Sequence, residues 1–80
     1  MIGSTVSKYS INIYPNPTNT VLHIASEEKI NSVNIYDMKG SEYLSTNNEK
    51  NLDVSNLTKG IYQLIIHTES KIINRKFLKI

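Results

Sequence analysis

The sequence lacks three features on which many functional sites depend. It contains no cysteine, so no disulfide supports the fold and no thiolate is available for metal binding or catalysis. Its only glycines are Gly3, Gly40 and Gly60, which leaves neither a glycine-rich phosphate loop nor a Gly-x-Ser-x-Gly turn for a serine nucleophile. No apolar run approaches the ~20 residues of a membrane-spanning helix. The net charge of +2 is also too small to favour nucleic-acid binding.

The residues that could transfer protons are few. His23 and His67 each lie in an apolar stretch, where a lone histidine is more typical of packing than of catalysis. Asp37 and Asp53 are the only aspartates, and each stands beside a turn, where a carboxylate commonly accepts backbone N–H groups. No Asp-x-Asp-x-Asp spacing is present for calcium. The sequence therefore predicts a protein that is not an enzyme and that has no cofactor, metal site or catalytic residue.

Short apolar stretches alternate with turn residues along the chain, at a spacing of roughly ten residues. Alternation with a period of two is typical of half-buried strands, and no segment sustains the 3.6-residue period of a helix. We therefore predict an all-β fold, an antiparallel sandwich of about seven strands. The expected strands are residues 9–14, 20–25, 30–37, 41–46, 51–54, 60–67 and 71–80.

The expected strand at residues 60–67 has apolar residues on both of its faces. A strand that is apolar on both faces is normally covered on both, so we expect this one to be the central strand. One face carries Tyr62, Leu64 and Ile66, and the other carries Ile61 and Ile65.

The last expected strand, residues 71–80, mixes basic and apolar residues and has no acidic one. Its apolar residues fall on both parities, so we expect either a bulge near residues 74–76 or an end that leaves the sheet. Two interpretations are open. Lysines on an edge strand discourage aggregation. Alternatively, this is a signal strand, whose charges dock, whose apolar side chains fill pockets and whose unpaired backbone edge pairs with a receptor.

Four blocks, in this order, resemble the type A C-terminal sorting domain of the type IX secretion system, also called the Por secretion system. They are residues 14–19 (YPNPTN), 33–40 (VNIYDMKG), 52–62 (LDVSNLTKGIY) and 76–80 (KFLKI). No single block is specific, but the four in sequence are. The motif residues that carry the resemblance are Pro15, Asn16, Pro17, Asp37, Gly40, Asp53, Gly60 and Tyr62.

The resemblance implies an immunoglobulin-like sandwich that follows a secreted cargo protein of Bacteroidetes-type bacteria. Residues 9–80 would be the sorting domain, and residues 1–8 a linker or vector-derived segment. The domain would take its cargo from the periplasm across the outer membrane, and a sortase-like cysteine protease would cut it off in or before residues 1–8. The cargo would then be anchored at the cell surface through lipopolysaccharide or released outside the cell. The partners would be the translocon, the sortase and the upstream cargo, without nucleic acid, and the domain would be a monomer.

Within this interpretation, the terminal strand is the part that the translocon recognises. Its lysines would steer docking by charge, and its backbone edge would offer unpaired N–H and C=O groups for strand addition. The expected recognition residues are Lys76, Phe77, Leu78, Lys79 and Ile80.

The alternative is an adhesion or carbohydrate-binding sandwich module of a secreted protein. Such a module would need an exposed aromatic patch or calcium in its loops. The five tyrosines are instead expected to pack across strands on the sheet faces. A sorting domain must also end its polypeptide, and a chain that ends on its last strand, at Ile80, favours sorting.

Overall fold

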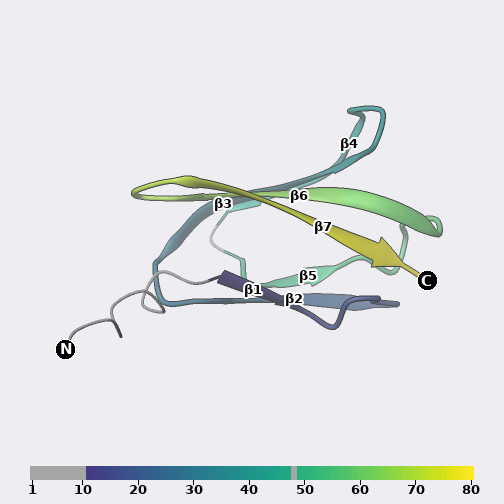
Figure 1. The fold of residues 1–80 in the computed structure, drawn as a ribbon, viewed down its shortest axis with the longest axis horizontal. Coiled ribbons are helices and arrows are strands. Elements are labelled where there is room, and N and C mark those ends of the chain that lie inside the picture. The colour runs from purple at the N-terminus through teal and green to yellow at the C-terminus, as the bar shows by residue number, and fades with distance from the viewer. Residues whose placement is uncertain (1–10, 48) are drawn as a thin grey trace.

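The computed structural model describes residues 11–47 and 49–80, which form seven β-strands in two layers (Figure 1). The expected linker of residues 1–8, together with residues 9 and 10 of the first expected strand, lies outside the described residues. The strands are β1 (Ile11–Tyr14), β2 (Val21–Ser26), β3 (Ile30–Asp37), β4 (Glu42–Asn47), β5 (Asn51–Asp53), β6 (Gly60–Thr68) and β7 (Ile72–Lys79).

The strands are arranged as an immunoglobulin-like sandwich. One sheet has the order β1-β2-β5 and the other β4-β3-β6-β7, and all neighbouring strands are antiparallel. After β4 the chain crosses to the opposite sheet, where β5 pairs with β2. Such a crossing between the sheets characterises this fold. The prediction of an all-β sandwich is confirmed, and from β2 to β7 every strand begins and ends within one residue of its expected bounds. Within the described part of the chain, no helix is long and apolar enough to cross a lipid bilayer.

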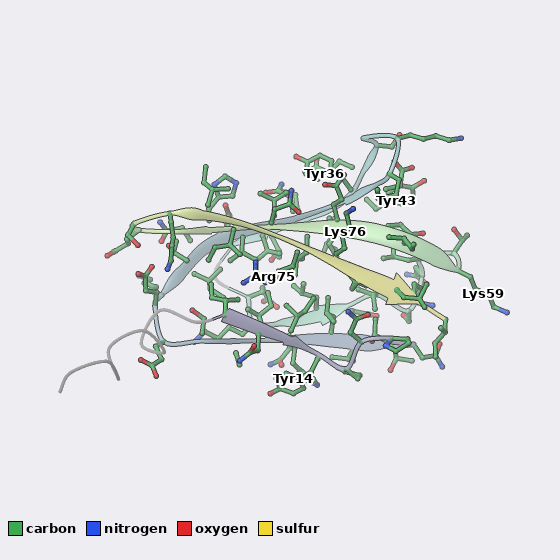
Figure 2. The ribbon with its side chains drawn as sticks, viewed as in Figure 1. Tyr14, Tyr36, Tyr43, Lys59, Arg75 and Lys76 are labelled. Atoms are coloured by element: carbon green, nitrogen blue, oxygen red, sulfur yellow. The ribbon has the colours of Figure 1, made fainter. Side chains whose placement is uncertain are left out.

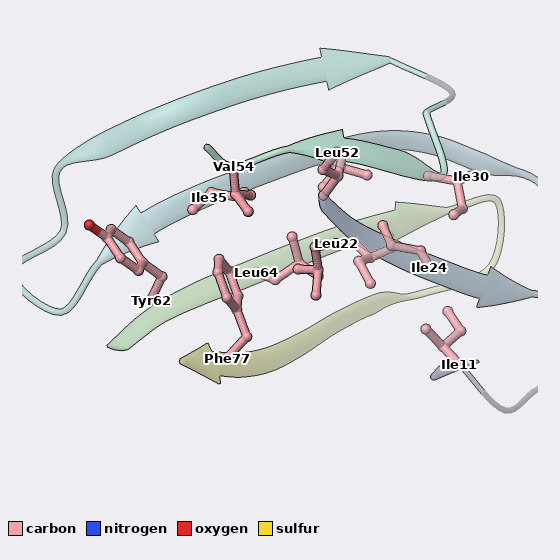
Figure 3. Packing of buried hydrophobic residues seen from close by; sticks show 12 residues of the cluster. Ile11, Leu22, Ile24, Ile30, Ile35, Leu52, Val54, Tyr62, Leu64 and Phe77 are labelled. Carbon is pink, nitrogen blue, oxygen red and sulfur yellow. The ribbon is translucent and has the colours of Figure 1, made fainter. Parts of the chain in front are cut away.

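The core lies between the two sheets and follows from the period-two pattern of the strands. Every second residue of β2 and β6 points inward, as do Val33 and Ile35 of β3, where an irregularity after Ile30 shifts the alternation by one residue. The two inner faces meet in one apolar cluster (Figure 3). Leu22, Val33, Ile35, Leu64 and Ile66 have no exposed surface. The other buried apolar residues are Ile11, Ile24, Ile30, Leu52, Val54, Tyr62 and Phe77.

The strand β6 is central in its sheet, between β3 and β7, as expected. The expectation that both of its faces are covered is wrong. The side chain of Ile61 is 53% exposed, and Ile65 is half-buried, because only the inner face of this sheet meets another layer. The apolar residues on the outer face therefore have no covering element among residues 11–47 and 49–80.

The strand β7 is regular, contrary to both alternatives expected for it. It pairs with β6 in unbroken register, from His67 opposite Ile72 to Gly60 opposite Lys79. Its mixed parity arises because apolar side chains occupy both faces: Phe77 is buried, whereas Ile72 is 67% exposed. A sequence pattern cannot distinguish exposed apolar residues from a bulge, since both break the alternation.

The start of β6 is fixed by a tyrosine that bonds back to the preceding turn. The hydroxyl of Tyr62 donates to the carbonyl oxygen of Thr58 at 2.7 Å, and its ring stacks on Phe77 with centroids 5.7 Å apart. Gly60, which lies between Thr58 and Tyr62 in the sequence, has a φ of +151°, a backbone conformation that favours glycine. This is the tyrosine corner found in many immunoglobulin-like sandwiches. It explains why glycine and tyrosine stand two positions apart here.

Tyr62→Phe removes the bond of the hydroxyl to the Thr58 carbonyl and its 3.1 Å hydrogen bond with the Thr58 hydroxyl. We expect it to lower the free energy of unfolding by about 0.5–1.5 kcal/mol for each bond lost. The ring and its packing are retained, so the loss isolates the corner. Urea unfolding measures the change. The matched control is Tyr14→Phe, on a tyrosine that is 52% exposed, and its stability should stay within about 0.5 kcal/mol of the original. Equal losses in the two variants would contradict the role of the corner.

Candidate recognition site at the terminal strand

The side chains of the five expected recognition residues alternate between the core and the solvent. Phe77 and Lys79 point inward and are only 2% and 5% exposed, whereas Lys76, Leu78 and Ile80 are exposed. The alternation follows from the pleat of β7. The structure therefore brings three of the five residues to one surface and withdraws the other two from it.

The backbone edge of β7 is occupied near its end by the loop between β1 and β2, residues 15–20. The N–H of Leu78 donates to the side-chain oxygen of Asn16 at 2.9 Å, and the amide of Asn16 donates to the carbonyl of Lys76 at 3.4 Å. The N–H of Thr18 donates to the carbonyl of Leu78, and the N–H of Ile80 to the carbonyl of Thr18, both at 2.9 Å. We call these four bonds the loop–strand clasp.

The expectation that this end of β7 offers unpaired backbone groups is therefore corrected. The outward-directed groups of Leu78 and the N–H of Ile80 are bonded to the loop, so a receptor strand could not pair with them in this structure. Natural sheets commonly protect an edge by covering it with a loop, and the clasp does this here. The lysines of the strand are not its only protection against edge-to-edge pairing.

Two buried polar residues accompany the clasp. Thr18 is 1% exposed, and its hydroxyl donates to the carbonyl of Val21. The ammonium of Lys79 donates to the main-chain oxygen of Ile80 at 3.2 Å. The expectation that Lys79 presents a steering charge does not fit this burial, and Lys76 is the lysine of the pair that faces solvent. The burial of Thr18 and Lys79 was not predicted from the sequence, because threonine and lysine are residue types that are mostly exposed.

Asp37 closes the turn between β3 and β4. Its carboxylate accepts the N–H groups of Lys39 and Ser41, both at 2.9 Å, and Gly40 has a φ of +97° that suits the turn. The bond from the Ser41 backbone, followed by those from Lys39, Tyr43 and Gly40, lowers the pKa of Asp37 despite some desolvation. The carboxylate is therefore a turn cap rather than a proton-transfer group.

Asp53 has the same role at the end of β5. Its carboxylate accepts the hydroxyl of Ser55 at 2.6 Å and the backbone N–H of Ser55 at 3.0 Å, and these two bonds lower its pKa. The interpretation of both aspartates as turn acceptors is confirmed. Within the described ranges, no group of three or more His, Asp or Glu side chains is placed to hold a metal ion.

Comparison with known proteins identifies the family of the chain. Residues 12–80 match the model of a family described as the secretion system C-terminal sorting domain, whereas no curated protein matches the chain. The chain belongs to this family. The family supports a C-terminal sorting signal of type IX secretion. It is not a family of enzymes, and it implies Bacteroidetes-type bacteria.

The histidines of this sorting domain lie on opposite outer faces of the sandwich. His23 is on β2, where its Nδ1 is hydrogen-bonded to the side-chain oxygen of Asn51 and its ring lies 5.2 Å from that of Tyr14. His67 is on β6, in the other sheet, opposite Ile72. They cannot act on one substrate, because both layers of the sandwich lie between them.

The described tyrosines are distributed over the molecule and do not line one surface (Figure 2). Tyr14 lies on the three-stranded sheet, and Tyr36 and Tyr43 lie on the four-stranded sheet. The ring of Tyr43 meets Tyr62 edge-on with centroids 5.7 Å apart. The expected packing across strands is confirmed for the pairs Tyr43–Tyr62 and Tyr14–His23. This distribution does not favour a carbohydrate platform.

The lowered pKa of Asp37 makes the stability of the domain depend on pH in acid. A carboxylate whose folded pKa lies below its ordinary value, here 3.8, stabilises the fold fully above that value. The contribution is lost as the pH falls through the folded pKa. We expect Asp37→Asn to show a smaller decrease in the free energy of unfolding below pH 3.8 than the unaltered domain, in urea titrations at several pH values. Identical acid slopes would contradict the turn-cap role, because Asp53 contributes equally to both proteins.

Proposed function

We propose that the domain directs an upstream cargo protein across the outer membrane through the type IX translocon. The observation that carries the proposal is the family match, which extends over residues 12–80 and includes the whole of β7. The domain acts as a recognised folded module, in which Asp37 and Asp53 cap turns. The cargo passes through the periplasm and ends at the cell surface or outside the cell.

We also propose that the domain is a substrate of processing. A sortase-like protease cuts the chain in or before residues 1–8 and separates the domain from the cargo, which is then anchored to lipopolysaccharide or released. The domain acts as a monomer throughout.

The terminal residues Lys76, Phe77, Leu78, Lys79 and Ile80 are the proposed recognition element. The four hydrogen bonds of the clasp hold this element in one conformation before any receptor binds. A preorganised element loses less conformational entropy on binding than a flexible tail would. Deleting the last residues is a poor test, since it would also remove bonds that the fold uses.

A charge reversal tests the proposal more cleanly. Residues 9–80 are fused to a periplasmic reporter in a bacterium with a type IX system, and the reporter is measured in the periplasm, at the cell surface and in the medium. We expect the unaltered fusion to be exported and Lys76→Glu to remain in the periplasm, because the exposed charge at this position has changed sign.

The matched control is Lys39→Glu, an exposed lysine in the turn between β3 and β4. Both changes are on the surface and should alter stability by no more than about 0.5 kcal/mol, which circular dichroism melting checks. Normal export of folded Lys76→Glu would contradict the role of the terminal strand. A periplasmic location of the unaltered fusion would contradict the sorting function itself.

A further inference from the structure

The clasp leaves the terminal strand accessible mainly through its outward side chains. Phe77 and Lys79 face the core, and the backbone groups of Leu78 are bonded to the loop. Whatever binds this end of β7 in the folded domain therefore meets it from the outer face of the four-stranded sheet. That face is shared with β6, because the two strands are paired along their whole length.

The outer face next to the end of β7 forms one patch with contributions from both strands. Ile61 stands directly opposite Leu78, and Gln63 opposite Lys76. Ile61 is 53% exposed, Leu78 39% and Ile80 52%, so aliphatic side chains make up much of its exposed surface. We call these residues the β6–β7 patch: Ile61, Gln63, Lys76, Leu78 and Ile80.

The charged side chains of the patch are of one sign. Lys76 lies within it, and Lys59 comes just before β6 at the same end of the sheet (Figure 2). Among the described residues, the outward positions of β6 and β7 include no carboxylate. The nearest acidic position in this row of the sheet is Glu42 on β4, two strands from β6 on the side away from β7. Its carboxylate accepts a hydrogen bond from Asn34 at 2.6 Å. A complementary surface would be apolar and would carry a carboxylate opposite Lys76.

We propose that the β6–β7 patch docks face-on to an apolar, acidic protein surface of the secretion machinery, and that Ile61 is a recognition residue although it lies outside the terminal strand. This inference rests on the proposed function and assigns a surface to it. Ile61 and Leu78 supply the desolvated aliphatic centre, while Lys76 pairs with the carboxylate at the edge of that centre. The backbone pairing of the sheet stays intact.

The single sign and small number of charges favour a protein partner over a lipid surface. Sequence-encoded binding to anionic lipids typically uses clusters of about 4–8 basic residues. The patch has one lysine within it and one beside it. A short-range pair with a protein carboxylate can use one lysine, since the partner supplies the opposite charge in a fixed position.

The test replaces Ile61 by glutamate in the reporter fusion and compares it with Ile72→Glu. Ile72 is 67% exposed on the same face, near the other end of the sheet, so the two changes are chemically identical and differ only in place. We expect export to fall roughly tenfold or more for Ile61→Glu, the change that 1.4 kcal/mol of binding free energy produces, and to be unchanged for Ile72→Glu.

The outcomes separate the two proposals. If the unaltered fusion is exported and folded Ile61→Glu is exported as well as Ile72→Glu, the patch is not the docking surface, whereas the sorting function stands. If the unaltered fusion is not exported, the sorting function itself fails. Equal loss in both isoleucine variants would also contradict the patch, because it would place recognition over the whole face.

A second measurement does not depend on how Ile61→Glu folds. A benzoylphenylalanine photocrosslinker at position 61 should join the fusion to a component of the type IX machinery, and Lys76→Glu should abolish this product. The same crosslinker at position 72 should give no such product. Crosslinking that is equal at both positions, or binding of the purified fusion to vesicles of anionic phospholipid, would overturn a protein docking surface at the patch.

Discussion

The terminal strand depends on a hydrogen-bonded contact with a loop that is 62 residues away in sequence. Asn16 and Thr18 belong to the loop after β1, in the three-stranded sheet, yet they bond to the end of β7, in the four-stranded sheet. The clasp therefore joins the two layers at one end of the sandwich. A typical hydrogen bond contributes a net ~0.5–1.5 kcal/mol. The four bonds of the clasp are therefore a considerable part of the stability of so small a domain.

The clasp also connects two motifs that are far apart in the sequence. The Pro-Asn-Pro-Thr segment and the basic, apolar end of the chain lie in the first and last of the four blocks that resemble the family, and in space they are neighbours. Asn16 uses both ends of its amide, accepting from Leu78 and donating to Lys76. An aliphatic residue could not replace either bond, and an aspartate could accept but not donate. The identity of this residue is thus explained by the strand that it holds.

Much of the fold could be predicted from the sequence because its signals are local. The period-two pattern depends on the pleat, and the turns at Asp37 and Gly40 depend on residues within four positions of one another. The geometry of the site was harder to predict from the sequence. The partner of Asn16 is set by how the sheets stack, and the burial of Lys79 depends on the same stacking. The exposure of Ile61 shows the converse case, an apolar residue that stays on the surface. An apolar pattern indicates which residues could be buried, but it does not show which of them another element covers.

Amide hydrogen exchange at Leu78 tests the clasp most directly. The account predicts that the Leu78 amide of the original domain is protected and that Asn16→Ala speeds its exchange about tenfold or more, while the Leu64 amide, in the middle of the sheet, keeps its rate. The selective change would show that the side chain of Asn16 holds this edge of the strand. Exchange of Leu78 at the rate of an unstructured peptide in the original domain would contradict the clasp and the face-on recognition that depends on it.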